Sequence, residues 1–161
     1  MTVRAPGPRG AVDEVRVDLP PDLTAPRAAR AEVRKALSRW RLLAFLDTVT
    51  LAVSELVGNA VVHGRPPVRL VLSRGERSLR AGVHDRAPSR PASRGAGDDA
   101  ESGRGLAILD ALADDSGVEE LPQGGKIVFA TFSTGSEDEA PASEDAAPAP
   151  VVRLADVRKR S

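Results

Sequence analysis

The stretch D-T-V-T-L-A-V-S-E-L-V-G-N-A-V-V-H-G, residues 47–64, decides the fold of this chain. Apolar residues recur in it at the three- and four-residue spacing of one helix face: Val49, Val53, Leu56 and Ala60. The spacing predicts a helix from about Thr48 to His63. Asp47 is placed to cap its first turn. Gly64, just before two prolines, is placed where a left-handed C-terminal residue ends a helix.

Two polar residues interrupt the apolar character of this helix. Glu55 and Asn59 are four residues apart, so they lie one above the other on the same face, and His63 continues the row. A carboxylate and a carboxamide on an apolar helix need partners, because burying them bare costs free energy. Water supplies such partners in a solvent-facing stripe, and a hydrated metal ion with phosphates supplies them in a binding site. For the pair alone, the solvent-facing stripe is the favoured interpretation.

Length, charge and cysteine content exclude several classes of protein. The chain has 161 residues, enough for one domain with its own core. Lys and Arg number 23, as do Asp and Glu, so the net charge is zero and no nucleic-acid footprint is visible. Cysteine is absent, which excludes disulfides and thiolate sites. The start lacks the apolar region of a signal peptide, and no apolar run approaches the length of a membrane span. We therefore expect a cytoplasmic protein.

The first part of the chain predicts a strand and a helix. Residues 1–11 are rich in Pro and Gly, and we expect them to be disordered. From Val12 to Leu19 apolar and polar residues alternate, which is typical of a half-buried strand. Thr24 then caps a helix to about Trp40, with Pro26 in its first turn. The inner face of that helix is expected to consist of Ala29, Val33, Leu37 and Trp40.

After the central helix the pattern predicts hairpins around a long loop. Residues 68–73 and 79–84 alternate on either side of a turn at residues 75–77, and the second strand ends on Asp85. Residues 86–104 lack periodicity and carry several Gly, Pro and Ser residues, as binding loops do. A helix from Gly105 to about Ala113 follows. Its glycine-rich start is either a phosphate-binding site or simply a flexible entry to the helix.

A second hairpin and a polar tail complete the chain. Val118–Leu121 is expected to be a short strand, and Pro122 to Gly125 form a turn. Lys126–Phe132 is apolar on both faces, which predicts a central strand. The order of elements indicates an α+β fold: a two-layer sandwich of a mixed, mostly antiparallel sheet with helices on one face, over residues 12–132. Residues 133–161 form an Ala/Pro-rich acidic tail, expected to be disordered and dispensable for folding; its end at 151–161 is either a docking segment or, as we favour, frayed.

Several motifs together resemble the GHKL ATPase superfamily, which includes gyrase, histidine kinases and bacterial anti-sigma serine kinases. E-L-V-G-N-A-V-V-H-G, residues 55–64, looks like its Asn-box helix, and Asp85 stands where its Asp-x-Gly-x-Gly box begins. S-G-R-G-L-A-I-L, residues 102–109, looks like its second glycine box, and G-G-K-I-V-F, residues 124–129, like its closing strand. The resemblance covers Val12 to Phe132 and implies the ATP-binding Bergerat fold. The short length and element order resemble the anti-sigma kinase branch.

The resemblance implies a role for each matching residue. Asn59 would ligate Mg²⁺ on the ATP phosphates, and Glu55 would be the general base for the attacking hydroxyl. Asp85 would accept a hydrogen bond from adenine. The second glycine box would hold the phosphates through Gly103, Arg104, Gly105 and Leu106. The implied partners are a small anti-anti-sigma (STAS-like) protein and a sigma factor, without nucleic acid or membrane; a homodimer is left open.

The chain departs from the family pattern directly after Asp85. Arg86, Ala87, Pro88 and Ser89 follow, so both glycines of the Asp-x-Gly-x-Gly box are missing. Glycine there permits positive φ and close backbone approach, which Ala and Pro do not. Two functions therefore compete: a serine/threonine kinase acting on an anti-anti-sigma partner, and a binding module of the same fold without phosphoryl transfer. A stand-alone nucleotide hydrolase ranks behind both.

Overall fold

The computed structural model describes residues 10–88 and 107–135 in full, and residues 151–153 by their backbone. The elements, in chain order, are β1 (Asp13–Leu19), α1 (Ala25–Arg39), the 3₁₀ helix η1 (Leu43–Phe45), α2 (Leu46–His63), β2 (Val68–Arg74), β3 (Ser78–Asp85), β4 (Asp115–Glu120), β5 (Lys126–Ser133) and β6 (Val151–Arg153). Residues 107–112 are also helical. The predicted N-terminal lead at 1–9 lies outside the described residues.

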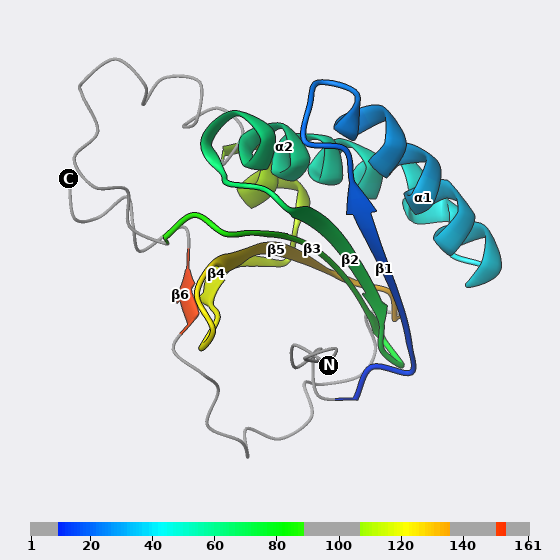
Figure 1. Cartoon of the computed structure of the whole chain (residues 1–161). Coiled ribbons are helices and arrows are strands. Elements are labelled where there is room, and N and C mark those ends of the chain that lie inside the picture. The colour runs from blue at the N-terminus through cyan, green and yellow to red at the C-terminus, as the bar shows by residue number, and fades with distance from the viewer. Residues whose placement is uncertain (1–9, 89–106, 136–150, 154–161) are drawn as a thin grey trace.

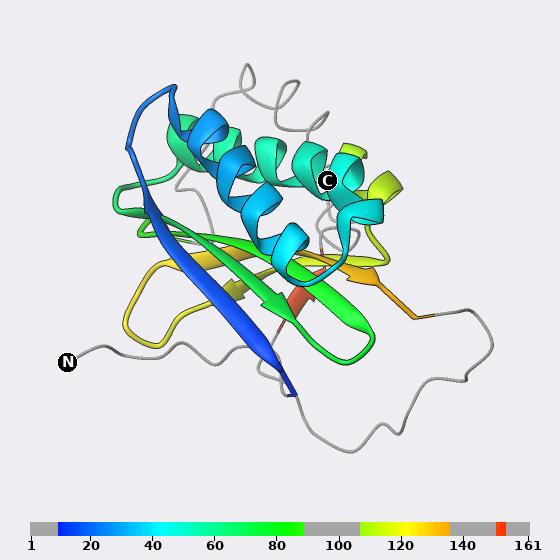
Figure 2. The ribbon, with the colours of Figure 1, turned by 90° about the vertical axis from the view of Figure 1, so that its right-hand side faces the viewer.

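One curved sheet carries the helices on one of its faces (Figures 1 and 2). Its six strands follow the order β1-β2-β3-β5-β4-β6, and all five pairings are antiparallel. The α+β two-layer prediction is confirmed, and β5 is central as predicted. The expected parallel component is absent among the described strands, because each successive strand reverses against its neighbour.

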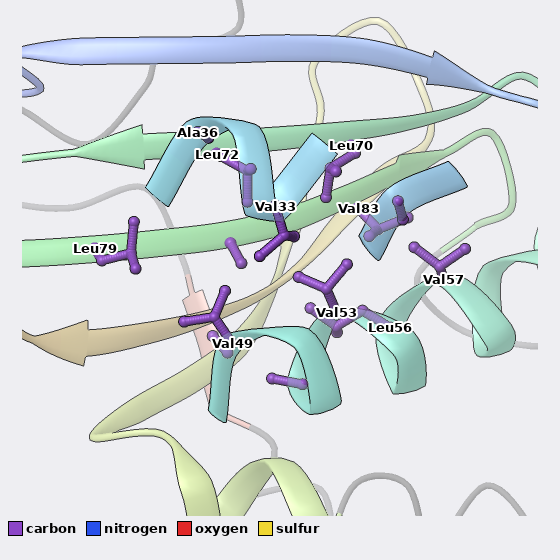
Figure 3. Close-up of a cluster of buried hydrophobic side chains, with 14 of the residues drawn as sticks. Val33, Ala36, Val49, Val53, Leu56, Val57, Leu70, Leu72, Leu79 and Val83 are labelled. Atoms are coloured by element: carbon purple, nitrogen blue, oxygen red, sulfur yellow. The ribbon is translucent and has the colours of Figure 1, made fainter. Parts of the chain in front are cut away.

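The register of the sheet builds the core between the two layers. Val17, Leu70, Val83 and Val128 are successive partners across β1, β2, β3 and β5, and they point toward the helices. The core between the helices and the sheet consists almost entirely of aliphatic side chains. Figure 3 shows Val33 of α1, Val53 of α2 and Leu70 of β2 among them. Each of these three side chains is fully buried. The predicted inner faces of α1 and α2 are buried throughout.

The ends of the helices differ from the prediction. Thr24 precedes α1, as predicted, but its hydroxyl donates to Asp22 Oδ1 and accepts no hydrogen bond from a backbone N–H of the helix. α2 begins at Leu46, two residues before the predicted start, because η1 leads directly into it. Phe45 therefore occupies the cap position, and Asp47 lies inside the first turn. The predicted capping by Asp47 is wrong; its carboxylate still favours the positive end of the helix dipole.

The central helix is more apolar than its polar row suggested. Leu43–His63 is long and apolar enough to cross a membrane by length and composition, the one such segment in the described part of the chain. The expectation that no apolar run reaches this length is therefore wrong. The reason is that both faces carry apolar residues: the inner face packs in the core, while Leu51 and Val62 are exposed.

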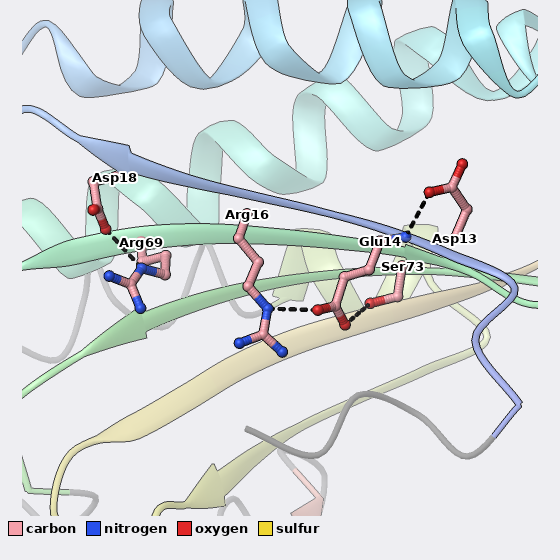
Figure 4. A network of polar contacts seen from close by, with 6 residues as sticks. All are labelled: Asp13, Glu14, Arg16, Asp18, Arg69 and Ser73. Atoms are coloured by element: carbon pink, nitrogen blue, oxygen red, sulfur yellow. Dashed lines mark hydrogen bonds and ion pairs between the residues drawn. The ribbon is translucent and has the colours of Figure 1, made fainter. Parts of the chain in front are cut away.

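The other face of the sheet carries charge pairs on β1 and β2 and, around β5, a small buried apolar cluster of Leu121, Ile127 and Phe129. On β1 and β2, Glu14 accepts from Arg16 and from the Ser73 hydroxyl, and Arg69 pairs with Asp18 (Figure 4). Farther along, the Arg80 guanidinium lies 4.1 Å from the Phe129 ring centroid and donates to Glu119 at 2.9 Å. Arg80 thus reaches from β3 over β5 to β4, and it covers the aromatic ring on the side that carries no α-helix among the described elements.

The tail does not behave as predicted at one point. Val151–Arg153 forms β6, which pairs antiparallel with β4 through three residue pairs. The expected frayed end is therefore wrong for these three residues. Without them β4 would be an edge strand with unpaired backbone N–H and C=O groups, and the extended segment of two valines and an arginine pairs with those groups. The rest of the expected tail, residues 136–150 and 154–161, lies outside the described residues.

Replacing Arg80 should destabilise the domain because Glu119 would lose its charged partner. The two side chains are only 15% and 13% exposed. We expect Arg80→Met to lower the free energy of unfolding by about 1.5–3 kcal/mol, the range for hydrogen bonds to charged groups. Arg69→Met is the matched control, since Arg69 and Asp18 are 36% and 65% exposed and such pairs contribute less than about 1 kcal/mol. Urea unfolding measures both; equal losses would contradict the assigned role.

Candidate functional site

The polar row on α2 lies at the border between its buried and exposed faces. Glu55 and Asn59 are both half-buried, and neither side chain has a hydrogen bond or ion pair to another of the described residues. Four residues of helix rise about 6 Å, so the two side chains are successive neighbours along the axis. A half-buried carboxylate and carboxamide without side-chain partners in the described part of the chain are available to water or a ligand. The sequence prediction that they share one face is confirmed by this helix.

Asp85 is the most deeply buried carboxylate in the described part of the chain, at 1% exposure. Its Oδ1 accepts from the backbone N–H of Ala87 at 2.7 Å and, more weakly, from that of Arg65 at 3.4 Å. The Arg86 N–H donates to the Arg65 carbonyl at 2.9 Å. Asp85 therefore joins the segment that leaves α2 to the turn that leaves β3.

Gly64 makes this junction possible, although not in the way the sequence predicts. Its φ of −81° and ψ of −174° are extended, so the predicted left-handed conformation is wrong. A Cβ at this position would lie 2.3 Å from the Ala60 carbonyl oxygen and 2.8 Å from Asp85 Cγ. The glycine is needed because the helix end and the carboxylate approach too closely for any side chain.

A second glycine holds the same strand end from the other side. Gly125, in the turn between β4 and β5, has a φ of +88°, which glycine adopts without strain. A Cβ there would lie 2.6 Å from the Asp85 carbonyl oxygen and 3.2 Å from His84 Nε2. The sequence marks residues 124 and 125 as a turn and as the start of the closing strand motif. Their close approach to Asp85 could not be found from spacing, because forty residues separate them.

His84, at the end of β3, is a half-buried titratable group to which the sequence analysis assigns no function. Its Nε2 is buried and has no hydrogen-bond partner among the described residues. Burial lowers the pKa of His84 below its usual 6.5, and the positive charges of Arg69 and Arg86 lower it further, against the opposing charges of Asp85 and Asp18. The neutral imidazole is therefore the form that this site favours.

The structure brings together only part of the predicted site. The end of α2 and Asp85 are in contact, and Glu55 and Asn59 lie along the same helix at about 14 Å and 8 Å of helix rise from Gly64. The predicted phosphate-binding residues Gly103, Arg104, Gly105 and Leu106 lie outside the described residues. Of the predicted helix that follows them, residues 107–112 are observed, and Leu109 is fully buried as expected.

The donor set fits a magnesium-bound phosphate better than it fits a cage of protein ligands. Among the described residues, no cluster of three or more His, Cys, Asp or Glu is placed to hold a metal ion. One carboxamide and one carboxylate oxygen on α2 suit Mg²⁺, which keeps most of its ligands as water and phosphate. The Asp85 carboxylate is less available to adenine than the resemblance implies, because its Oδ1 already accepts hydrogen bonds from two backbone N–H groups.

Comparison with known proteins bears directly on this arrangement. A family model described as "Histidine kinase-like ATPase domain" matches residues 19–132, more than half of the chain. The chain belongs to this family. Membership implies ATP binding and confirms the predicted GHKL relationship. No curated protein matches the chain.

The fold of this histidine kinase-like ATPase domain is also found among solved structures. One is the crystal structure of the RsbU and RsbW domains of Rv1364c from Mycobacterium tuberculosis, with a TM-score of 0.55 and 24% identity. The match covers 80% of this chain and 33% of that one. At this identity the likeness concerns the fold, and the chain spans about a third of the larger protein.

Gly64→Ala should destabilise the domain through the contact with Asp85. The added Cβ meets the Ala60 carbonyl oxygen, which is backbone and cannot swing away. We expect a loss of about 1–3 kcal/mol in the free energy of unfolding, the range for overpacking. Gly58→Ala is the matched control on the same helix: a Cβ there meets nothing within 4 Å, and helix propensity should raise stability by about 0.5–1 kcal/mol. Urea unfolding that ranks the two variants equally would refute the close contact.

Stability should fall on acidification because of His84. Its pKa is lower in the folded state than its ordinary 6.5, so below about pH 6.5 the unfolded chain binds a proton that the folded chain does not. Stability is then full above about pH 6.5 and is lost as the pH falls toward the lowered value. Urea unfolding between pH 5 and 8 should show this slope reduced in His84→Asn and retained in His63→Asn, the exposed histidine. An unchanged slope in His84→Asn would exclude His84 as its source.

Proposed function

We propose that this histidine kinase-like ATPase domain is a serine/threonine protein kinase of the anti-sigma type. It binds Mg-ATP, transfers the γ-phosphoryl group to a hydroxyl of a small anti-anti-sigma protein, and thereby regulates the availability of a sigma factor in the cytoplasm. The observation that carries the proposal is the row on α2: Glu55 and Asn59 are half-buried, aligned, and without partners among the described residues.

Each residue of the row has a chemical task in such a transfer. ATP supplies the phosphoryl group, and Mg²⁺ neutralises charge on its phosphates. The Asn59 carboxamide oxygen is a neutral ligand for the hard metal ion. The Glu55 carboxylate accepts the hydrogen bond of the attacking hydroxyl and takes its proton as the new phosphoester bond forms and the bond to ADP breaks. A serine hydroxyl is a poor nucleophile at neutral pH, so this acceptor must be positioned beforehand.

A specific observation favours a second candidate, a protein-binding module without phosphoryl transfer. Ala87 stands where the family pattern has glycine, and its N–H donates to Asp85 Oδ1 at 2.7 Å. The Asp85 carboxylate thereby links the backbone segments that follow α2 and β3. Because Asp85 is only 1% exposed, the adenine of a nucleotide can reach it only if the neighbouring segments of the chain move. Weak nucleotide binding with intact partner binding is the outcome that this candidate predicts.

Substitutions on α2 test the kinase proposal. Asn59→Ala should weaken Mg²⁺-dependent ATP binding, measured by isothermal titration with and without Mg²⁺, because a metal ligand is lost. Glu55→Ala should leave ATP binding nearly unchanged and slow transfer by about a hundredfold or more, the range for a lost general base. Transfer is measured with radiolabelled ATP and a panel of small anti-anti-sigma domains. Asp47→Ala is the control, since it removes an exposed carboxylate about 12 Å of helix rise from Glu55.

The same assay separates the two candidates. Tight binding of a partner domain without labelling of any would reject the kinase and support the binding module. Labelling that proceeds equally fast in Glu55→Ala would keep the kinase but reject Glu55 as the base. ATP binding that ignores both Mg²⁺ and Asn59→Ala would reject the role of Asn59.

A further inference from the structure

A row of arginines lies along the outer side of α1. Arg27, Arg34 and Arg41 follow one another at seven-residue spacing, and Arg30 lies beside them. Residues seven apart share a face of a helix and are about 10 Å apart along its axis. All four side chains are exposed, and none has a hydrogen bond or ion pair to another of the described residues. Figure 2 looks onto α1 from outside the helical layer, and no described element lies in front of it.

Other basic residues of the same helix have acidic partners within the chain. Lys35 donates to Glu32 at 2.8 Å, and the Arg39 guanidinium lies 3.4 Å from the Asp13 carboxylate. The described part of the chain leaves the arginine row without such a partner, although the net charge of the whole chain is zero. The row is therefore a local excess of positive charge that the fold itself does not neutralise.

The charges of the row are unfavourable to α1 itself. Arg27 lies in the first turn, which has no acidic residue, although the positive end of the helix dipole favours carboxylates there. Arg30 is three residues from Arg27 and four from Arg34, so like charges are direct neighbours on the helix surface. Both effects destabilise the helix. Carboxylates brought by another molecule would relieve both of them.

Arg41 adds an unfavourable backbone conformation to the same row. It follows the end of α1 with a φ of 58°, in the left-handed region. The Leu42 N–H donates to the Leu37 carbonyl at 2.8 Å, which is the pattern of a helix end that usually has glycine in this place. A side chain is strained there, and the exposed Arg41 guanidinium gains no hydrogen bond from the described residues in return. Strain without an internal benefit indicates a function for the guanidinium.

Exposed leucines lie at both ends of the row. Leu23, which precedes α1, is 84% exposed, and Leu43, which follows it, is 51% exposed. By contrast, no aromatic side chain is exposed among the described residues, so none is available to stack on nucleic-acid bases. Arginines between exposed aliphatic residues therefore suit an acidic protein surface better than they suit a nucleic acid.

We propose that the outer side of α1 binds an acidic helix of a partner protein. The partner helix lies along α1 with carboxylates at seven-residue spacing opposite the arginine row, and with apolar residues opposite the two exposed leucines. A second helix repeats at the same interval of about 10 Å, so each guanidinium of the row meets a carboxylate in a charge-assisted pair. The inference concerns a different helix from the polar row of α2, and it is independent of nucleotide and of the proposed kinase activity.

A titration of the full chain with helical peptides tests this surface. The probe is a fluorescein-labelled, alanine-based helix of about three heptads, with one glutamate at the same position of each heptad and a leucine near each end. A scrambled peptide of the same composition, with its glutamates spread around the helix, should bind more weakly. Arg34→Gln should weaken binding of the probe at least about tenfold, because a charge-assisted pair is lost. Lys35→Gln is the matched control, and we expect it to change the affinity less than about twofold.

Arg41→Gly separates binding from folding. Glycine adopts the left-handed conformation without strain, so this variant should unfold at a higher urea concentration than wild type. It should nevertheless bind the probe at least about fivefold more weakly, because it lacks the guanidinium. An affinity equal to that of wild type would exclude Arg41 from the binding surface and contradict the proposed row.

Other outcomes of the titration would overturn the inference as a whole. These are no binding of the probe, equal binding of the probe and the scrambled peptide, and equal losses in Arg34→Gln and Lys35→Gln. Tighter binding of phosphatidylglycerol vesicles or duplex DNA than of the probe, weakened by Arg34→Gln, would assign the row to an anionic lipid or nucleic acid instead. A wild-type dimer in light scattering that Arg34→Gln dissociates would place a second copy of the chain on the row.

Discussion

The end of α2 lies directly against the carboxylate of Asp85, and Gly64 permits this because a Cβ there would lie 2.8 Å from Asp85 Cγ. From this contact follows the position of the polar row, since Glu55 and Asn59 belong to the same helix. On its other side the strand end is held by Gly125, whose Cβ would lie 2.6 Å from the Asp85 carbonyl oxygen. Two glycines far apart in sequence thus allow two chain segments to approach Asp85 closely. These approaches fix the position of Asp85 relative to the end of α2.

Most of the fold could be predicted from the sequence because its elements carry strong local patterns. The alternation in β1, β2 and β3 and the helical spacing in α1 and α2 each reflect burial of one face, which is a local property of the chain. The errors arise where the decisive neighbour is remote. Asp47 cannot cap α2, because η1 extends the helix upstream. β6 could not be recognised, because its partner β4 is more than thirty residues away and the surrounding composition is polar.

The candidate site shows the same division between local and remote information. The four-residue spacing of Glu55 and Asn59 places them on one face in any α-helix, so their alignment followed from the sequence. The use of Asp85 did not: two backbone N–H groups, one of them twenty residues upstream, take up its Oδ1. Likewise His84 looked unremarkable, since only packing reveals that its Nε2 is buried without a partner among the residues that the structure describes. Sequence patterns report faces of elements, whereas burial and hydrogen bonding depend on which elements meet.

The strand order places the first and the last of the described strands, β1 and β6, at opposite edges of the sheet (Figure 1). Five strand spacings separate β1 from β6, which amounts to about 24 Å along the sheet. A domain fused ahead of β1 and one fused behind β6 would therefore join the sheet at its opposite edges. By the same geometry, a circular permutant joining the two ends would need a linker that crosses the whole width of the sheet.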